Sequence, residues 1–217
     1  MSMHVAELWR YPVKSMRGEA LQQADITMEG IAGDRLVQVA RPERGVVTSR
    51  THPRLLLHAG AFVDGQTLVD GHHWHSHEAQ KAMRSAVPDG FLTDVHDRHD
   101  VLPLSIATDG AVAVSGLDRR RFRPNIVIGG VEGLAERSWP GGTLRIGGTV
   151  IRIWRLRPRC VMTTYDPDTI EQDHRVLRSL VDRFDGTFAL DCDVLEAGSI
   201  RVGDPVLLLS ERQHSTT

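Results

Sequence analysis

One cysteine placed between a predicted strand and a turn has the clearest chemical potential in this sequence. Cys160 follows Arg157-Pro158-Arg159 and precedes the turn-rich residues 161–169. We expect the two arginines to favour the thiolate, the form that ligates soft metals or attacks electrophiles. A side chain at such a junction can be presented to a ligand. An inert buried thiol is the alternative, and the local residues leave both interpretations open.

The second cysteine has different neighbours. Cys192 stands between Asp191 and Asp193, and the two carboxylates disfavour a thiolate. We therefore expect Cys192 to be structural. Because the N-terminus carries no secretory signal, the two cysteines are expected to be reduced cytosolic thiols rather than a disulfide.

Basic residues occur at several predicted turns and strand ends. Lys14, Arg35 and Arg50 each lie at such a position, and four arginines occupy the run from Arg119 to Arg123. Guanidinium and ammonium groups at loop ends suit a phosphate or another anion. Any one of them is equally explained as a solvated surface charge, so an anion site requires that they converge.

A histidine-rich segment is the remaining candidate for metal binding. His72, His73, His75 and His77 could hold zinc or nickel, but no cysteine or carboxylate accompanies them at ligand spacing. We expect no physiological metal there. Dinucleotide, P-loop, zinc-protease and serine-hydrolase motifs are absent from the sequence.

The elements that would position these residues are mostly short strands. Apolar residues alternate with period two, and Gly, Pro and Asp turn signals bound the segments, as is typical of barrels. The predicted strands are 5–9, 21–28, 36–40, 111–115, 126–128, 144–154 (with a Gly147-Gly148 turn) and 200–209 (with a Gly203-Asp204-Pro205 turn). Helices are predicted over 78–86, after Ser76 or His77, and over 173–184, with Asp173 as the N-terminal cap.

The fold is therefore expected to be mainly β with a few helices. A charged, Pro- and Gly-containing interruption near residues 85–103 suggests an N-terminal part over 1–100, a larger part over 101–210 and a polar tail over 211–217. The formal net charge of −2 predicts no general attraction to nucleic acid or anionic membranes. No stretch approaches the ~20 apolar residues of a membrane span, so a cytoplasmic protein is expected.

Seven short motifs together resemble the MOSC family, which is named for the C-terminal domain of molybdenum cofactor sulfurase. The resemblance is to the branch with an N-terminal MOSC β-barrel, which includes the mitochondrial amidoxime-reducing components and bacterial relatives. The motifs, in family order, are Tyr11-Pro12-Val13-Lys14-Ser15, Gly33-Asp34-Arg35, Thr48-Ser49-Arg50-Thr51-His52-Pro53-Arg54-Leu55, Phe122-Arg123-Pro124-Asn125-Ile126-Val127-Ile128, Glu136-Arg137-Ser138-Trp139, Arg159-Cys160-Val161-Met162-Thr163-Thr164-Tyr165-Asp166-Pro167 and Gly203-Asp204-Pro205-Val206.

The resemblance implies a β-barrel MOSC fold with an N-terminal β-barrel-like part, and a molybdenum–molybdopterin cofactor whose metal is bound by Cys160. The predicted cofactor-binding residues are Lys14, Ser15, Arg35, Arg50, Arg123, Asn125, Arg159 and Cys160. One departure is Pro158, where the family often has Cys or Ser, because proline removes a polar group and a backbone donor. The segment between the two halves is also short, so the substrate-side wall near residues 58–103 is expected to differ.

The resemblance further implies an oxidoreductase that reduces N-hydroxylated or related N–O small molecules with electrons from a separate protein. Two cysteines are too few for a ferredoxin-type iron–sulfur cluster, so none is expected in this chain. Asp166 is a candidate proton-transfer residue, with bracing of its own turn as the alternative. Two other functions remain open: sulfur transfer or C–S bond chemistry through a Cys160 persulfide, and non-catalytic carriage of the cofactor.

Overall fold

The computed structural model of the chain describes residues 2–42, 45–95 and 102–209. The predicted polar tail and most of the charged run 94–100 lie outside these residues. Among the described residues, no helix combines the length and the apolar character needed to cross a membrane.

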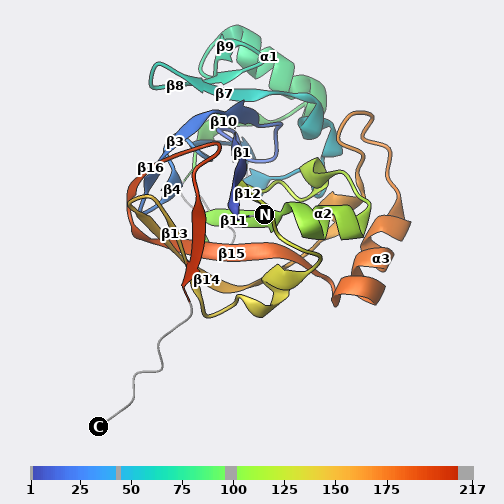
Figure 1. Cartoon of the computed structure of the whole chain (residues 1–217). Helices are drawn as coiled ribbons and strands as arrows, with labels where there is room; N and C mark the ends of the chain where they lie inside the picture. Colours follow the sequence, from blue (N-terminus) through green and yellow to red (C-terminus); the bar gives the residue numbers. More distant parts are fainter. Residues whose placement is uncertain (1, 43–44, 96–101, 210–217) are drawn as a thin grey trace.

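An eight-stranded sheet forms the centre of the molecule (Figure 1). Strands β11 and β12 run parallel, and the other neighbouring pairs in this sheet are antiparallel. Its strands, in spatial order, are β17 (Val206–Leu209), β13 (Thr143–Ile146), β14 (Thr149–Pro158), β15 (Thr187–Glu196), β11 (Leu104–Thr108), β12 (Ile126–Gly129), β1 (His4–Arg10) and β2 (Glu19–Leu21).

Three smaller sheets complete the strand content of the described residues, so the prediction of a mainly β fold with few helices is confirmed. The first consists of β10 (Phe91–Asp94), β5 (Val37–Arg41) and β6 (Gly45–Val47); the second of β16 (Gly198–Arg201), β3 (Gln23–Thr27) and β4 (Gly30–Ile31); and the third of β7 (Gly60–Val63), β8 (Gln66–Val69) and β9 (His72–His73). In Figure 1 the third sheet lies with α1 (His77–Ala86) at one end of the molecule, beyond the central sheet.

The helices follow from capping and amphipathic spacing. The Ser76 hydroxyl accepts a hydrogen bond from the Ala79 amide at the start of α1. Asp173 caps α3 (His174–Phe184), which buries Val176, Leu180 and Phe184. Both predicted helices are confirmed. Four short 3₁₀ helices add to these: η1 (Pro53–Leu57), η2 (Arg119–Arg121), η3 (Ala135–Ser138) and η4 (Val161–Thr164).

The predicted strand over 111–115 is wrong, because this segment belongs to helix α2 (Asp109–Ser115). The Thr108 hydroxyl accepts from the Ala111 amide at one end, and Gly116 adopts a left-handed conformation at the other. Strands β11 and β12 are parallel neighbours, so the chain between them must cross over rather than form a hairpin. The alternation of Ala and Val over 111–114 could not reveal that this segment lies in a crossover.

The predicted strand over 21–28 is split between two sheets. β2 pairs with β1, whereas β3 pairs with β16 and β4. The predicted segments 144–154 and 200–209 each contain two strands separated at the predicted turns, as β13 and β14 and as β16 and β17.

The N-terminal segment is structurally part of the C-terminal half as well. β1 pairs with β12, and β3 pairs with β16. The described residues form three apolar cores: one on the central sheet, which includes Cys192, one between β5, β8 and α1, and one between α2, α3 and β15. The first of these cores contains residues from both halves of the sequence, such as Val5 and Ile128.

Candidate functional site

A cavity of about 300 Å³ lies beside Cys160, and we name it the cysteine cavity. Both halves of the sequence contribute to it. The N-terminal half contributes the loop after β1 and the segment that precedes η1, and the C-terminal half contributes η2 and the end of β14 with η4. Its lining residues are Lys14, Ser15, Arg35, Thr48, Arg50, Leu102, Arg121, Phe122, Arg123, Arg155, Arg157, Pro158, Arg159, Cys160, Met162 and Asp191.

Cys160 is presented by the junction between β14 and η4. The β14–β15 pairing ends at Pro158 opposite Thr187, and the Arg159 amide then donates to the Gly186 carbonyl. Cys160 begins η4, and its carbonyl accepts from both the amide and the hydroxyl of Thr163. This backbone anchoring fixes the residue while its side chain remains partly exposed.

Two arginines in this cavity lie in surroundings that disfavour their positive charge. Burial, followed by repulsion from neighbouring arginines, lowers the pKa of Arg159 to about 10. Burial likewise lowers the pKa of Arg123 to about 10. Arg159 Nη2 donates to the Phe122 carbonyl at 3.0 Å, but its Nε and Nη1 atoms are buried and have no hydrogen-bond partner among the described residues. Since buried polar groups are nearly always paired, an anionic ligand is the partner that this side chain lacks.

Lys14, Ser15 and Arg35 reach the cavity from the N-terminal half. The Lys14 amide donates to the Val37 carbonyl, and the Arg35 amide donates to the Tyr11 carbonyl. Ser15, with φ 72°, and Arg35, with φ 49°, are in the left-handed region, which costs free energy for non-glycine residues. The fold thus holds these two residues in strained conformations at the cavity wall.

Asn125 lies behind the cavity wall rather than in it. Its side chain is fully buried; Oδ1 accepts from the Ser105 amide and from Arg35 Nη1, and Nδ2 donates to Asp34. Asp34 in turn forms an ion pair with Arg35 and accepts from the Tyr11 amide. The geometry therefore assigns Asn125 to the support of Arg35, whereas its direct contact with a cofactor stays a prediction.

Asp166 also lies outside the cavity lining. Its carboxylate accepts from the amides of Asp168 and Thr169 and from Arg121 Nη2 at 3.0 Å. The backbone hydrogen bonds, with help from Arg121, hold the pKa of Asp166 below its usual range. This geometry favours the bracing role, and the proton-transfer role stays a prediction.

Comparison with known families covers both halves of the chain. The model of the MOSC N-terminal beta barrel domain matches residues 2–89, and the model of the MOSC domain matches residues 101–207. The chain belongs to the MOSC family.

Curated relatives align with almost the whole of this MOSC chain. It is 26% identical to mitochondrial amidoxime reducing component 2 of Macaca fascicularis, with 93% of the chain and 82% of the relative covered. It is also 26% identical to mitochondrial amidoxime-reducing component 1 of Homo sapiens, with 95% and 83% covered. The YUAD protein from Bacillus subtilis shares the fold at 14% identity, with a TM-score of 0.56 and 98% of each chain covered.

Seven of the predicted site residues of this MOSC chain line one cavity. They are Lys14, Ser15, Arg35, Arg50, Arg123, Arg159 and Cys160. Arg121 belongs to the basic run over 119–123 that the sequence analysis singled out, and Arg157 was noted there as a neighbour of Cys160. The roles of Arg155 and Asp191 were missed. Arg155 and Arg157 both form ion pairs with Asp191, which is fully buried on β15. The sequence did carry a signal for this basic surface, since an arginine stands at every second position before Cys160 and alternate residues of a strand share a face.

Cys192 and the histidine-rich segment do not line the cysteine cavity. Cys192 is fully buried in the central core, and burial raises the pKa of its thiol well above the ordinary value. His73 stacks on the rings of Trp74 and His75, and His77 begins α1. No group of three or more metal-ligating His, Cys, Asp or Glu side chains occurs in the described part of the chain.

Proposed function

We propose that this chain binds the molybdenum cofactor with Cys160 as the metal ligand and reduces N-hydroxylated or related N–O compounds with electrons from a separate protein. The observation that carries the proposal is the convergence of one thiol and eight cationic side chains on the cysteine cavity. The cations are Lys14, Arg35, Arg50, Arg121, Arg123, Arg155, Arg157 and Arg159, and Asp191 is the carboxylate in the lining.

The residues present fit such a cofactor. Its phosphate and pterin require cations and hydrogen-bond donors, and Arg159 has two buried donors that find no partner in the described part of the chain. Its metal requires a soft anionic ligand, which Cys160 can supply. Lys14, Ser15, Arg35 and Arg50 would hold the cofactor from the N-terminal side, with Arg123 and Arg159 from the other. When bound, the cofactor supplies two-electron redox chemistry and Lewis acidity.

The protein's part in the reaction is placement and charge. Arg121 lines the cavity and is held at 3.0 Å by Asp166, so we assign Asp166 a positioning role through Arg121. The names of the curated relatives favour amidoximes as one substrate class. Cys160 is assigned to molybdenum and Cys192 is buried in the core, so neither cysteine is left to bind an iron–sulfur cluster. Electrons are therefore expected from a partner protein.

Metal and pterin analysis of protein made in a cofactor-competent host tests the proposal. Wild type and Cys192→Ala should each hold about one molybdenum per chain, whereas Cys160→Ala should hold almost none, because it lacks the thiolate. Equal retention in all three proteins would refute the ligand assignment. A labile sulfur on Cys160 in metal-free wild type would instead support sulfur transfer.

The source of electrons is tested separately with the loaded protein. NADH or NADPH alone should give no amidoxime reduction, and a viologen dye or an added cytochrome b5 system should restore it. Full molybdenum loading with no turnover under any donor would leave cofactor carriage as the better function.

A further inference from the structure

Three polar side chains of the N-terminal half are hydrogen-bonded in series: a carboxylate, an imidazole and a hydroxyl. Asp70 Oδ2 lies 2.7 Å from His58 Nδ1, and Ser85 Oγ lies 3.2 Å from His58 Nε2. The same series of groups activates a serine in hydrolases of unrelated folds, where geometry and role define it rather than sequence position. We name Asp70, His58 and Ser85 the serine cluster.

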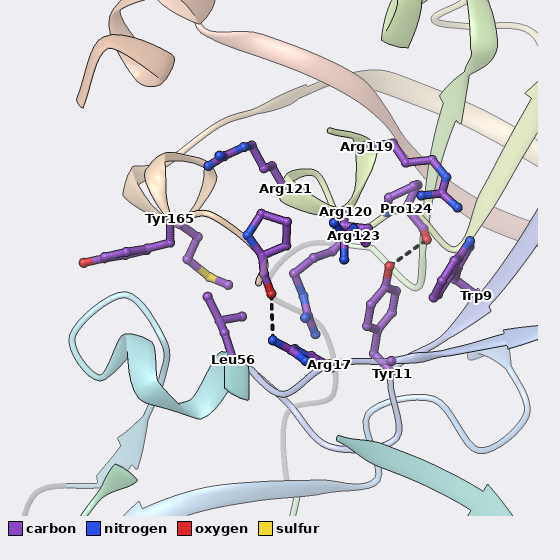
Figure 2. A pocket seen from close by; sticks show the side chains of 13 residues that line it. Trp9, Tyr11, Arg17, Leu56, Arg119, Arg120, Arg121, Arg123, Pro124 and Tyr165 are labelled. Atoms are coloured by element: carbon purple, nitrogen blue, oxygen red, sulfur yellow. Dashed lines mark hydrogen bonds between the residues drawn. The ribbon is translucent and has the colours of Figure 1, made fainter. Parts of the chain in front are cut away.

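The serine cluster is separate from the candidate cofactor site. None of its three residues lines the cysteine cavity. A second cavity, of about 190 Å³, lies between the end of β1, η1 and η2, and Figure 2 shows Leu56 of η1 among the side chains that line it. His58, two residues further along the chain, is not part of this lining. Chemistry at the serine cluster therefore requires no molybdenum and goes beyond the function proposed above.

Asp70 is fixed at the turn that follows β8. Its amide donates to the Ala59 carbonyl, and its Oδ1 accepts from the Ala59 amide at 2.8 Å. Its φ of 50° lies in the left-handed region, which aspartate adopts more readily than most residues. Because Oδ1 is held by Ala59, Oδ2 is the oxygen that meets the imidazole of His58.

His58 connects the carboxylate to the hydroxyl. Its amide donates to the Leu55 carbonyl at the end of η1, and its carbonyl accepts from the Arg17 amide, so its backbone is anchored on both sides. The His58 side chain is 13% exposed. A neutral imidazole whose Nδ1 donates to a carboxylate presents a lone pair on Nε2. Asp70 therefore selects the tautomer in which His58 accepts the proton of Ser85.

Ser85 lies in the last turn of α1 and is exposed to solvent. In the selected tautomer its hydroxyl donates to His58 Nε2, and a hydroxyl with such a base beside it is an activated nucleophile. Lys81 precedes Ser85 by four residues, so the two side chains are neighbours on one face of α1. The Lys81 ammonium is thus the cation that serves negative charge developing at Ser85.

We propose that Ser85 is a nucleophile with His58 as its base, and that the serine cluster hydrolyses small activated esters. The Ser85 oxygen bonds to the ester carbonyl carbon, His58 takes the hydroxyl proton, and Lys81 stabilises the oxygen that becomes negative. The bond to the leaving alcohol then breaks, and His58 gives the proton to that alcohol. Water attacks the acyl-serine in the same way, which releases the carboxylic acid and restores Ser85.

The exposure of Ser85 determines which esters fit. An open surface supplies little binding energy to orient a substrate, so the reactivity must come from the leaving group. Aryl acetates, whose phenolate is a weakly basic leaving group, are therefore the expected substrate class.

Labelling of the full-length holoprotein with a fluorophosphonate, followed by peptide mass mapping, tests the activation of Ser85. Ser85 should react at least about tenfold faster than Ser199, an exposed serine whose hydroxyl bonds to Gln23 instead of a histidine. His58→Gln and Asp70→Asn should each lower the rate at Ser85 about 100-fold, which is the contribution of a positioned general base. Asp70→Asn keeps an acceptor for the Ala59 amide, so the turn after β8 is retained.

Release of p-nitrophenol from p-nitrophenyl acetate tests the hydrolysis. Wild type should exceed Ser85→Ala at least about tenfold, and Ser199→Ala, the matched control, should equal wild type. Thermal unfolding is measured on every variant, since a cluster that only ties η1 to α1 would change stability and leave the rates unchanged. Labelling of Ser85 no faster than that of Ser199 overturns the inference. Unchanged labelling in folded Asp70→Asn, or equal ester turnover by wild type and Ser85→Ala, does so as well.

Discussion

At the residue scale, Arg159 has the surroundings that most clearly require a ligand. Its guanidinium packs over the Phe122 ring, at 5.4 Å from the centroid, and shares the cavity with Arg123 and Arg157. A half-buried cation beside other cations, with two buried donors that no described residue pairs, is unfavourable until an anion binds. The Arg159 guanidinium therefore destabilises the ligand-free protein and stabilises the complex with an anion.

Arg159→Gln is expected to separate these two effects. Cofactor retention should fall about tenfold or more, because a charge-assisted hydrogen bond contributes roughly 1.5–3 kcal/mol. The unfolding temperature of the ligand-free protein should stay the same or rise. Pterin release after dialysis and thermal melts measure the two quantities. Arg152→Gln is the control and should retain the cofactor, because Arg152 is exposed on β14, the strand that leads to Arg159, and pairs with Asp193.

Glu136 gives a prediction on pH at the same scale. Its side chain is buried and accepts from the Thr108 hydroxyl, and burial raises the pKa of this carboxyl above its ordinary value. The folded state therefore holds the proton more tightly than the unfolded state. This contribution to stability is complete below the unfolded pKa and is lost as pH rises through the folded pKa.

Glu136→Gln should consequently increase the free energy of unfolding at pH 7, since it keeps a side-chain acceptor and removes a buried charge. The gain over wild type should shrink as the pH falls through the raised folded-state pKa and should stay constant below about 4.5, the ordinary glutamate pKa. Urea unfolding at several pH values measures this difference. A gain that grows toward low pH would contradict the assigned direction of the shift.

At the element scale, helix α2 depends on a close approach of its backbone to a neighbouring loop. A Cβ atom at Gly110 would lie 2.3 Å from the Val131 carbonyl oxygen and 2.7 Å from the Gly133 carbonyl oxygen. Asp109 fixes this contact, because its carboxylate accepts from the amides of Gly130 and Val131. Glycine at position 110 is thus required by space rather than by helix propensity.

Gly110→Ala should lower the free energy of unfolding by about 2–3 kcal/mol, because both clashing atoms belong to the backbone and cannot rotate away. Gly148→Ala should change stability little, since nothing lies within 4 Å of a Cβ atom there and its φ is not positive. Denaturant unfolding of the two variants provides the comparison. Similar losses for both would remove the steric explanation.

At the scale of the whole molecule, the cysteine cavity exists only where the two halves of the sequence meet. β1 extends the central sheet next to β12, and the chain that follows it carries Lys14 and Ser15 to the cavity. The family models match the two halves separately, but the strand pairing joins them. Domain boundaries near residue 100 stay a prediction, and the strand pairing between the two halves argues against their independent folding.

A fragment of residues 101–209 should therefore neither fold cooperatively nor retain pterin, because the missing β1 exposes the edge of β12 and removes Lys14 and Arg35. Co-expression with residues 1–100 should restore a soluble complex that binds the cofactor. Gel filtration and pterin fluorescence report on both. A folded, pterin-binding fragment alone would show that the N-terminal contacts are dispensable.

The sequence by itself determined the mainly β class, both capped helices and seven residues of the cavity lining. These features depend on local spacing, on caps such as Asp173, and on motifs that the chain carries in order. The tertiary structure decided the rest. α2 lies in the crossover that the parallel pairing of β11 and β12 requires. Asn125 and Asp166 lie outside the cavity lining, where their side chains are held by hydrogen bonds to other residues. The second cavity, which shares Arg121, Arg123 and Met162 with the cysteine cavity, combines residues from β1, η1, η2 and the segment after η4, and no sequence spacing brings these together. Side chains from distant segments meet because of the order in which the strands pair, and local sequence patterns do not specify that order.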